Sequence, residues 1–259
     1  MIYFDAVAAD YDGREADNPI MQLMRERSLA ILESTFPRGS ALLDVGCGTG
    51  TEAVFLAKRG RNVFGVDASP LMLDVLSLRT AAAGLRVLTR HLHAGDLVRL
   101  VDELGEASFD GAYSSFGALN TEAALEPPLV ALSRLVRPGG RIVLGVMNRW
   151  CVTEMALLVA AGRTKDAFRR TLPSVRVGVG AGAAEVRYPS WRRLSRALRP
   201  LFRVVSVQAL PLLLVPYAWP ALSRHRRLYG TVSRLDRVLA PHRPFAWLGD
   251  HLLVVAERP

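Results

Sequence analysis

The feature that most constrains this chain is a glycine-rich turn between a short apolar segment and a helix-forming segment. Residues 41–45 are the apolar run, glycine stands at Gly46, Gly48 and Gly50, and residues 51–59 have helical character. Glycine has no Cβ atom, so a turn of this kind bends sharply and lets a ligand approach the backbone closely. The sequence therefore predicts a strand, a turn and a helix that together bind a ligand at the end of the strand.

The same alternation of strand and helix runs through most of the chain, after a helical region in the first forty residues. Further strands are expected at 62–66, 86–93, 109–114, 141–147, 202–207 and 252–256, with helices at 70–83, 122–135 and 190–198. Such alternation predicts an α/β fold, a doubly wound and mostly parallel sheet with helices on both faces. In these sheets the ligand lies beyond the carboxyl ends of the strands.

The turn itself argues against a nicotinamide cofactor. That fingerprint requires a third glycine five positions after the first, where this chain has Thr51. Asp44 also comes directly before the turn, where it would repel a pyrophosphate and attract an ammonium group.

Two more acids follow the next strands. Asp67 stands 23 residues after Asp44, close to the ~20 residues expected for a carboxylate that binds ribose hydroxyls. Asp96 follows the third strand. Any one of these acids is usual in a loop, but three at successive strand ends beside a glycine turn predict a nucleoside site.

Taken together, these motifs resemble those of class I methyltransferases that use S-adenosylmethionine (SAM), most closely the ubiquinone/menaquinone-biosynthesis (methyltransferase domain 11-like) branch. The resemblance covers about residues 3–148 and is carried by segments 42–50, 66–72, 95–96, 109–115 and 135–140. It implies a Rossmann-like seven-stranded sheet whose last strand is antiparallel, with caps inserted after strands five and six. Residues 1–148 would be the SAM-binding core with N-terminal lid helices. Residues 149–259 would complete the same domain with strands six and seven and the cap inserts 149–189 and 208–247.

The resemblance also implies a role for each motif position. The turn would contact methionine and ribose, Asp44 the amino group, Asp67 the ribose hydroxyls and Asp96 the adenine amino group. The full set expected to contact SAM, or its product S-adenosylhomocysteine, is Tyr11, Asp44, Gly46, Cys47, Gly48, Thr49, Gly50, Asp67, Ala68, Met72, Gly95, Asp96, Leu97, Ser114 and Ser115.

The acceptor side of the site is less determined. Asn120, in the loop after the fourth strand, is one candidate catalytic group, although it also fits the N-cap of the following helix. His251, just before the last strand, is the other. No metal is expected, because His91 and His93 lack the ligand spacing of a metal site.

Charge divides the chain into two halves. Residues 1–140 carry a net charge of −5 and residues 141–259 a net charge of +14. The basic half indicates either a solvated face or an anionic partner. Segment 204–223 has no charge but contains three prolines, which favours a packed insert, a lid or a membrane-resting patch over a transmembrane helix.

The prediction is therefore methyl transfer from SAM to a small, apolar or lipid-like acceptor, with or without an anionic group. The alternatives are an RNA or protein methyltransferase docking through the basic half, or a SAM-binding scaffold without turnover. Nucleic acid is disfavoured because the 114–117 segment lacks the motif of DNA amino-methylating enzymes. Two cysteines and no evident leader favour the cytoplasm, with peripheral membrane contact open and the oligomeric state undetermined.

Overall fold

A seven-stranded sheet forms the centre of the protein, in a computed structural model that describes residues 4–16, 18–179, 182–214 and 226–259. The strand order is β3-β2-β1-β4-β5-β9-β8, and every neighbouring pair from β3 to β5 is parallel. β9 is antiparallel to both its neighbours. The strands are β1 (Ala41–Val45), β2 (Asn62–Asp67), β3 (Leu88–His91), β4 (Phe109–Ser114), β5 (Val136–Met147), β8 (Arg203–Leu210) and β9 (His251–Glu257). The predicted Rossmann-like sheet with an antiparallel last strand is confirmed.

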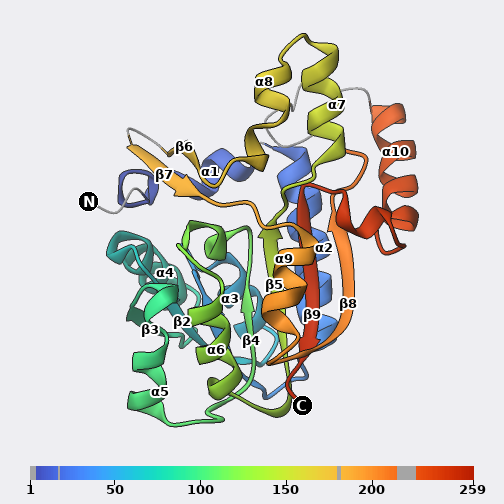
Figure 1. The fold of residues 1–259 in the computed structure, drawn as a ribbon. Coiled ribbons are helices and arrows are strands. Elements are labelled where there is room, and N and C mark those ends of the chain that lie inside the picture. The colour runs from blue at the N-terminus through green and yellow to red at the C-terminus, as the bar shows by residue number, and fades with distance from the viewer. Residues whose placement is uncertain (1–3, 17, 180–181, 215–225) are drawn as a thin grey trace.

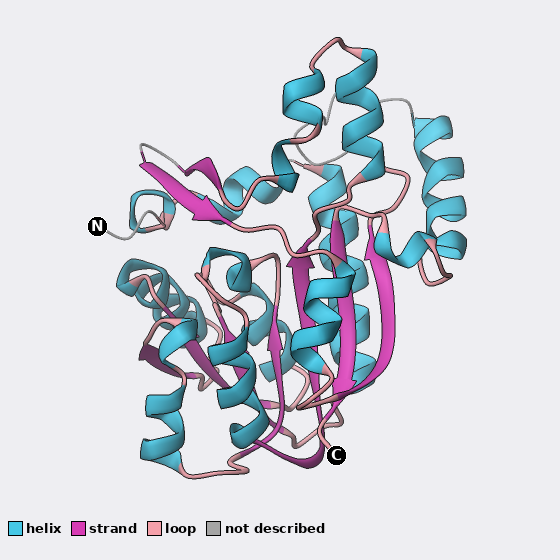
Figure 2. Ribbon diagram, in the orientation of Figure 1, coloured by secondary structure: helices cyan, strands magenta, loops and turns pink. Residues whose placement is uncertain are grey.

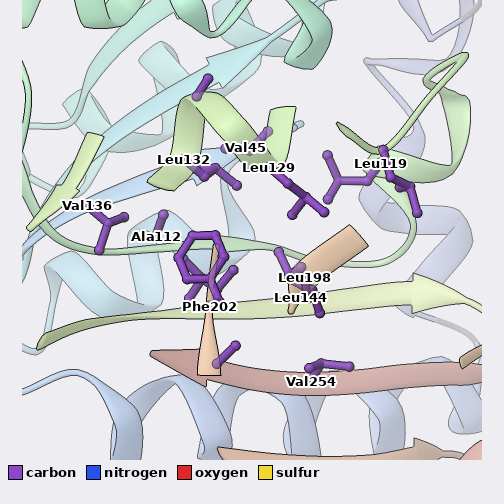
Figure 3. Close-up of a cluster of buried hydrophobic side chains, with 14 of the residues drawn as sticks. Val45, Ala112, Leu119, Leu129, Leu132, Val136, Leu144, Leu198, Phe202 and Val254 are labelled. Carbon is purple, nitrogen blue, oxygen red and sulfur yellow. The ribbon is translucent and has the colours of Figure 1, made fainter. Parts of the chain in front are cut away.

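Helices cover both faces of this sheet (Figure 1). One face packs against α2 (Pro19–Thr35), α3 (Thr51–Ala57) and α4 (Pro70–Ala82), and the other against α5 (Val98–Leu104), α6 (Glu126–Leu135) and α9 (Trp191–Leu198). Figure 3 shows the second of these cores, in which Phe202 lies among leucines and valines of α6, α9, β5 and β9. The sheet is therefore buried on both sides, which leaves its strand ends as the place for a ligand.

The remaining elements lie outside these layers. They are α1 (Tyr11–Ala16), α7 (Val152–Ala160), α8 (Thr164–Ala167), the hairpin of β6 (Val175–Val179) and β7 (Gly182–Val186), and α10 (Arg226–Leu239). Figure 2 shows that these elements, here called the cap, are mainly helical, with the hairpin at one side and α10 at the other. Among the described residues, no helix is both long and apolar enough to cross a bilayer.

Three sequence expectations need correction. The helix expected from residue 122 begins only at Glu126, since a short 3-10 turn (Ala118–Thr121) comes first and Pro127 and Pro128 start the helix. β3 is shorter than expected and ends at His91, so His93 does not share its face. α10 was not anticipated within the 208–247 insert, because arginines mask its apolar spacing. Part of segment 204–223 lies outside the described residues.

Candidate cofactor and acceptor site

The glycine turn has the conformation that its sequence predicts. Gly46, Gly48 and Gly50 all have positive φ, at 75°, 51° and 82°. A Cβ atom at Gly46 would lie 2.2 Å from the Cβ of Ala118, and one at Gly50 would lie 2.3 Å from Leu76. Only glycine satisfies both the backbone and the packing at these two positions.

Gly48 differs from the other two glycines. A Cβ atom there would meet no other atom within 4 Å, so the turn is open on this side. Its amide donates a 2.8 Å hydrogen bond to Oδ2 of Asp67, and the Ser69 amide donates to Oδ1. Asp67 therefore lies at the open side of the turn, as expected for a ribose ligand, and also holds the turn in place.

The other members of this loop are packed or bonded. Cys47 is buried, and its amide donates to the Val66 carbonyl, as the Gly46 amide also does. Burial, with Asp44 and Asp67 nearby, raises the pKa of the Cys47 thiol well above its usual value, so this side chain stays neutral. The Ala68 carbonyl lies 2.8 Å from Nε2 of His91.

Asp44 is the most unusual group at the turn. It is buried, and its Oδ2 has no hydrogen-bond partner among the described residues. Burial, followed by repulsion from Glu52, raises its pKa well above the usual value. A buried acceptor without a partner is costly, and a cation beside it would favour its ionised form. An ammonium group of the kind that SAM carries fits this requirement.

The N-terminal segment is fastened over the turn by two aspartates. Asp5 accepts a 2.5 Å hydrogen bond from the Ser69 hydroxyl, which also caps α4 by accepting from the Met72 amide. Asp12 accepts a 2.8 Å hydrogen bond from the Thr49 hydroxyl and forms an ion pair with Arg79. Apolar contacts complete the attachment, where Tyr11 packs in a cluster of Val7, Ala8 and Met72. The segment expected to close over SAM thus contacts both the turn and α4.

Replacing Asp12 by alanine is expected to weaken binding of S-adenosylhomocysteine by about tenfold, with the fold intact. The physical reason is the loss of one ion pair and of the hydrogen bond to Thr49, each worth about 1 kcal/mol. Calorimetric titration measures this change. The matched control is Asp74→Ala, which removes an exposed aspartate of α4 and should leave the affinity unchanged. Equal affinities of the two variants would show that Asp12 does not hold the N-terminal segment over the cofactor site.

The end of β3 carries one exposed acid and one buried leucine. Asp96 has an exposed side chain whose carboxylate lies 4.0 Å from Arg99. Leu97 is fully buried in the core beside Leu100, so its side chain does not face the open side of the turn. Close to Gly95, however, lies the half-buried Glu122, whose pKa is raised by burial. Glu122 was not singled out in the sequence.

The loop after β4 carries a second set of polar groups. The Ser114 hydroxyl is buried without a partner among the described residues, whereas Ser115 is partly exposed. Phe116 follows with φ at 50°, a left-handed conformation that is strained for a bulky residue. Strain of this kind is retained where the surroundings fix a position, and it clusters at functional sites.

Phe116 lies between Arg25 and His251. Its ring lies 4.9 Å from the guanidinium of Arg25, which forms a 2.5 Å ion pair with Glu52 at the start of α3. Its other neighbour is His251, with ring centroids 6.2 Å apart in an edge-on arrangement. A continuous set of contacts therefore runs from Glu52 through Arg25 and Phe116 to His251.

Both polar atoms of the Asn120 side chain form hydrogen bonds to backbone groups. Its amide donates to the carbonyls of Met147 (2.9 Å) and Arg187 (2.6 Å), and its Oδ1 accepts from the Met147 amide at 2.9 Å. It is not the N-cap of α6, since Leu125 occupies that position. Asn120 thus ties the end of β5 to the end of β7, which places the cap hairpin on the core.

His251 belongs to a buried ionic cluster. Its Nδ1 lies 2.8 Å from Oδ2 of Asp250, while Nε2 makes no hydrogen bond within the described part of the chain. Arg170 lies 2.5 Å from the other carboxylate oxygen of Asp250 and also pairs with Glu154. Burial alone would raise the pKa of Asp250, but Arg170 and His251 hold it well below its usual range. Asp250 therefore stays ionised and fixes the imidazole tautomer that leaves Nε2 as the acceptor.

The same cluster has some features of a metal site. Ligand atoms of Cys151, Glu154 and Asp250 lie within 4.8 Å of one another. The cation in contact with both carboxylates is nevertheless the guanidinium of Arg170. Two surface hollows also occur, one along β8 and one along α9, and neither is lined by a residue of the glycine turn.

Comparison with known proteins agrees with this geometry. Residues 42–140 match a family model described as "Methyltransferase domain". The chain is 32% identical over 152 residues to a malonyl-[acyl-carrier protein] O-methyltransferase of Serratia marcescens. The aligned region covers 59% of this chain and 54% of that protein. It is 34% identical over 146 residues to a demethylmenaquinone methyltransferase of Clavibacter sepedonicus, covering 54% and 55%. The chain spans about half the length of the curated relatives it matches.

Solved structures share the fold. A putative SAM-dependent methyltransferase from Listeria monocytogenes superposes with a TM-score of 0.61 at 16% identity, over 90% of this chain and 96% of that one. Residues 42–140 are therefore a methyltransferase domain, and the seven-stranded sheet has the fold of class I SAM-dependent methyltransferases. Another protein of this fold, a 1,6-didemethyltoxoflavin-N1-methyltransferase of Burkholderia thailandensis solved with S-adenosylhomocysteine, superposes with a TM-score of 0.55 at 21% identity, over 98% of this chain and 87% of that one.

Proposed function

We propose that this protein transfers the methyl group of SAM to a small, apolar or lipid-like acceptor. The observation that carries the proposal is the buried Oδ2 of Asp44, which has no hydrogen-bond partner within the described part of the chain and belongs to the residue directly before the open glycine turn. When bound, SAM supplies a methyl group already activated on a sulfonium. The protein has therefore only to hold the reactants in line and to exclude water, and alignment alone can be worth ~7–11 kcal/mol of the barrier.

In this proposal each group of residues at the site has one role. Asp44 holds the amino group, Asp67 the ribose hydroxyls, and the Asp12-fastened N-terminal segment excludes water. The cap inserts 149–189 and 208–247 would enclose the acceptor, and Asn120 would position them rather than touch it. Several relatives are named ubiquinone biosynthesis O-methyltransferases, including one of Dechloromonas aromatica at 34% identity over 114 residues, which supports a hydroxyl acceptor. The two buried, free cysteines are compatible with a cytoplasmic location.

We assign the proton acceptor to Nε2 of His251. Methylation of a hydroxyl releases a proton, and a positioned imidazole accelerates such steps by about 10²- to 10⁴-fold. His251 is the first residue of β9, opposite Met147 at the carboxyl end of β5, and Asp250 holds its ring. Its contact with Phe116 places it beside the loop that follows Ser114 and Ser115.

His251→Ala is accordingly expected to reduce methyl transfer by about 100-fold or more without changing the affinity for S-adenosylhomocysteine. The assay follows label from methyl-labelled SAM into phenolic and quinol acceptors and into a cell extract. The matched control is His242→Ala, which removes an exposed histidine outside the proposed site and should retain full activity.

Two other results would refute separate parts of the proposal. If the His251 variant keeps full activity, the base is elsewhere. If the native protein binds S-adenosylhomocysteine but leaves all label on SAM, the protein is a SAM-binding scaffold and not a methyltransferase.

A further inference from the structure

The outer face of α10 is the surface of the molecule that methyl transfer does not explain. Three apolar side chains are exposed on it, Leu228 (63%), Leu235 (50%) and Val238 (62%). They are spaced by seven and three residues, so they form one stripe along the helix. Exposing three large apolar groups in a row is unfavourable in water, which indicates a partner for this face.

Arginines border the stripe. Arg227 and Arg234 are one helical repeat apart and form a parallel row, with Arg237 one turn further along. All three are exposed, and none has an ion pair to a carboxylate within the described residues. The only acid of the helix is Asp236, which is fully buried on the opposite side. The exposed face is thus apolar along one side and purely cationic along the other.

The inner side of α10 is firmly attached. Asp236 forms a 3.1 Å ion pair with Arg27 of α2 and accepts a hydrogen bond from the Leu212 amide. The Tyr229 hydroxyl donates to the Pro19 carbonyl. These contacts fix which face points outward, so the exposed stripe is not the result of a loosely docked helix.

More apolar groups are exposed in the neighbouring part of the cap. Figure 1 places α7, α8 and α10 at one end of the molecule, the end at which β5 terminates. Exposed large apolar residues of this part are Trp150, Val152, Val159, Phe168 and Leu172. The acceptor is proposed to enter at the same end of the sheet, beside His251.

We propose that the outer face of α10 docks the protein on an anionic lipid surface. An apolar stripe bordered by arginine is the pattern of a helix that lies in the plane of a membrane interface, with its apolar side in the acyl boundary and its cations among anionic headgroups. Because residues 141–259 carry a net charge of +14, this half of the chain is attracted to a negatively charged lipid surface. This inference is independent of the catalytic proposal, because it concerns a surface and not the cofactor site.

The test is co-sedimentation of the whole protein with vesicles of phosphatidylcholine alone or mixed equally with phosphatidylglycerol. Binding is expected only to the mixed vesicles and should weaken as salt rises. Arg227→Glu and Arg234→Glu should each lower the affinity by at least about fivefold, the effect expected for one arginine at such a surface. Leu235→Asp and Leu228→Asp should each lower it by about tenfold.

The control is Leu78→Asp, which places the same charge at an exposed leucine (73%) of α4 and should bind like the native protein. Because these positions are exposed, thermal unfolding should be unchanged in every variant. Absence of binding to the mixed vesicles would overturn the proposal, as would equal loss in the Leu78 variant. It would also be overturned if single-stranded RNA, and not the vesicles, bound through these arginines.

Discussion

Replacing Arg170 by methionine is expected to lower the free energy of unfolding by about 3–5 kcal/mol, the usual effect of removing one partner from a buried ionic cluster. Arg170 is 5% exposed and is the cation that pairs with both Glu154 and Asp250. Its guanidinium also lies 5.0 Å from the centre of the Tyr188 ring. Without it, Asp250 keeps only His251 as a basic neighbour, and Glu154 keeps only its pair with Arg169, at the edge of the cluster. Urea unfolding followed by circular dichroism measures the loss.

The matched control is Arg163→Met, which breaks an exposed pair with Asp166 on the same cap. Such pairs contribute about 0–1 kcal/mol, so this variant should be nearly as stable as the native protein. Equal stabilities of the Arg163 and Arg170 variants would show that the buried cluster does not hold the cap.

The pH dependence of the Arg170 variant has a definite sign. In the native protein the pKa of Asp250 is depressed, so its contribution to stability is complete above the unfolded carboxyl pKa of about 3.9. That contribution is lost only as the pH falls toward the lower folded pKa. In the Arg170 variant, burial without the guanidinium raises the pKa of the carboxyls instead. The stability difference between the two proteins should therefore be largest near neutral pH and should shrink on acidification.

Asp67→Ala is expected to weaken binding of S-adenosylhomocysteine by at least about 100-fold, because two charge-assisted hydrogen bonds to the ribose hydroxyls are lost, each worth about 1.5 kcal/mol or more. In addition, the Gly48 amide loses the acceptor that holds the turn. Isothermal titration of folded protein measures the affinity, with circular dichroism to show that the fold is retained.

Two further variants separate the loss of the Asp67 charge from the loss of its hydrogen bonds and from the effect of removing another acid. Asp67→Asn keeps acceptor oxygen for the Gly48 or Ser69 amide but not the charge, and should be intermediate. Asp96→Ala, at the exposed end of β3, should lose less than tenfold. If Asp67→Ala binds as tightly as the native protein, the ribose assignment is wrong.

The sequence predicted the parts of the site in which local rules decide the conformation. Glycines at Gly46, Gly48 and Gly50 require a bend, and the Ser69 cap fixes the start of α4, so both appear as expected. The repeated strand and helix predicted a mostly parallel sheet, and the structure confirms it. These features depend on neighbours within a few residues.

The missed features depend on contacts between distant segments. Arg170 meets Asp250 from 80 residues away, and Arg25 reaches Phe116 from another layer, so no spacing in the sequence indicates either pairing. Asn120 looked like a helix cap by type, yet it binds backbone groups 27 and 67 residues distant. The role of Asp12 could have been predicted from its position, since it lies beside Tyr11 in the N-terminal segment expected to close over the cofactor.

The central claim is that the glycine turn, Asp44 and Asp67 form a site for SAM, and direct titration calorimetry tests it. The native protein should bind S-adenosylhomocysteine with a one-to-one stoichiometry and should not bind NAD. Binding of NAD without binding of S-adenosylhomocysteine would contradict the account, because the same turn would then recognise a pyrophosphate in spite of Asp44.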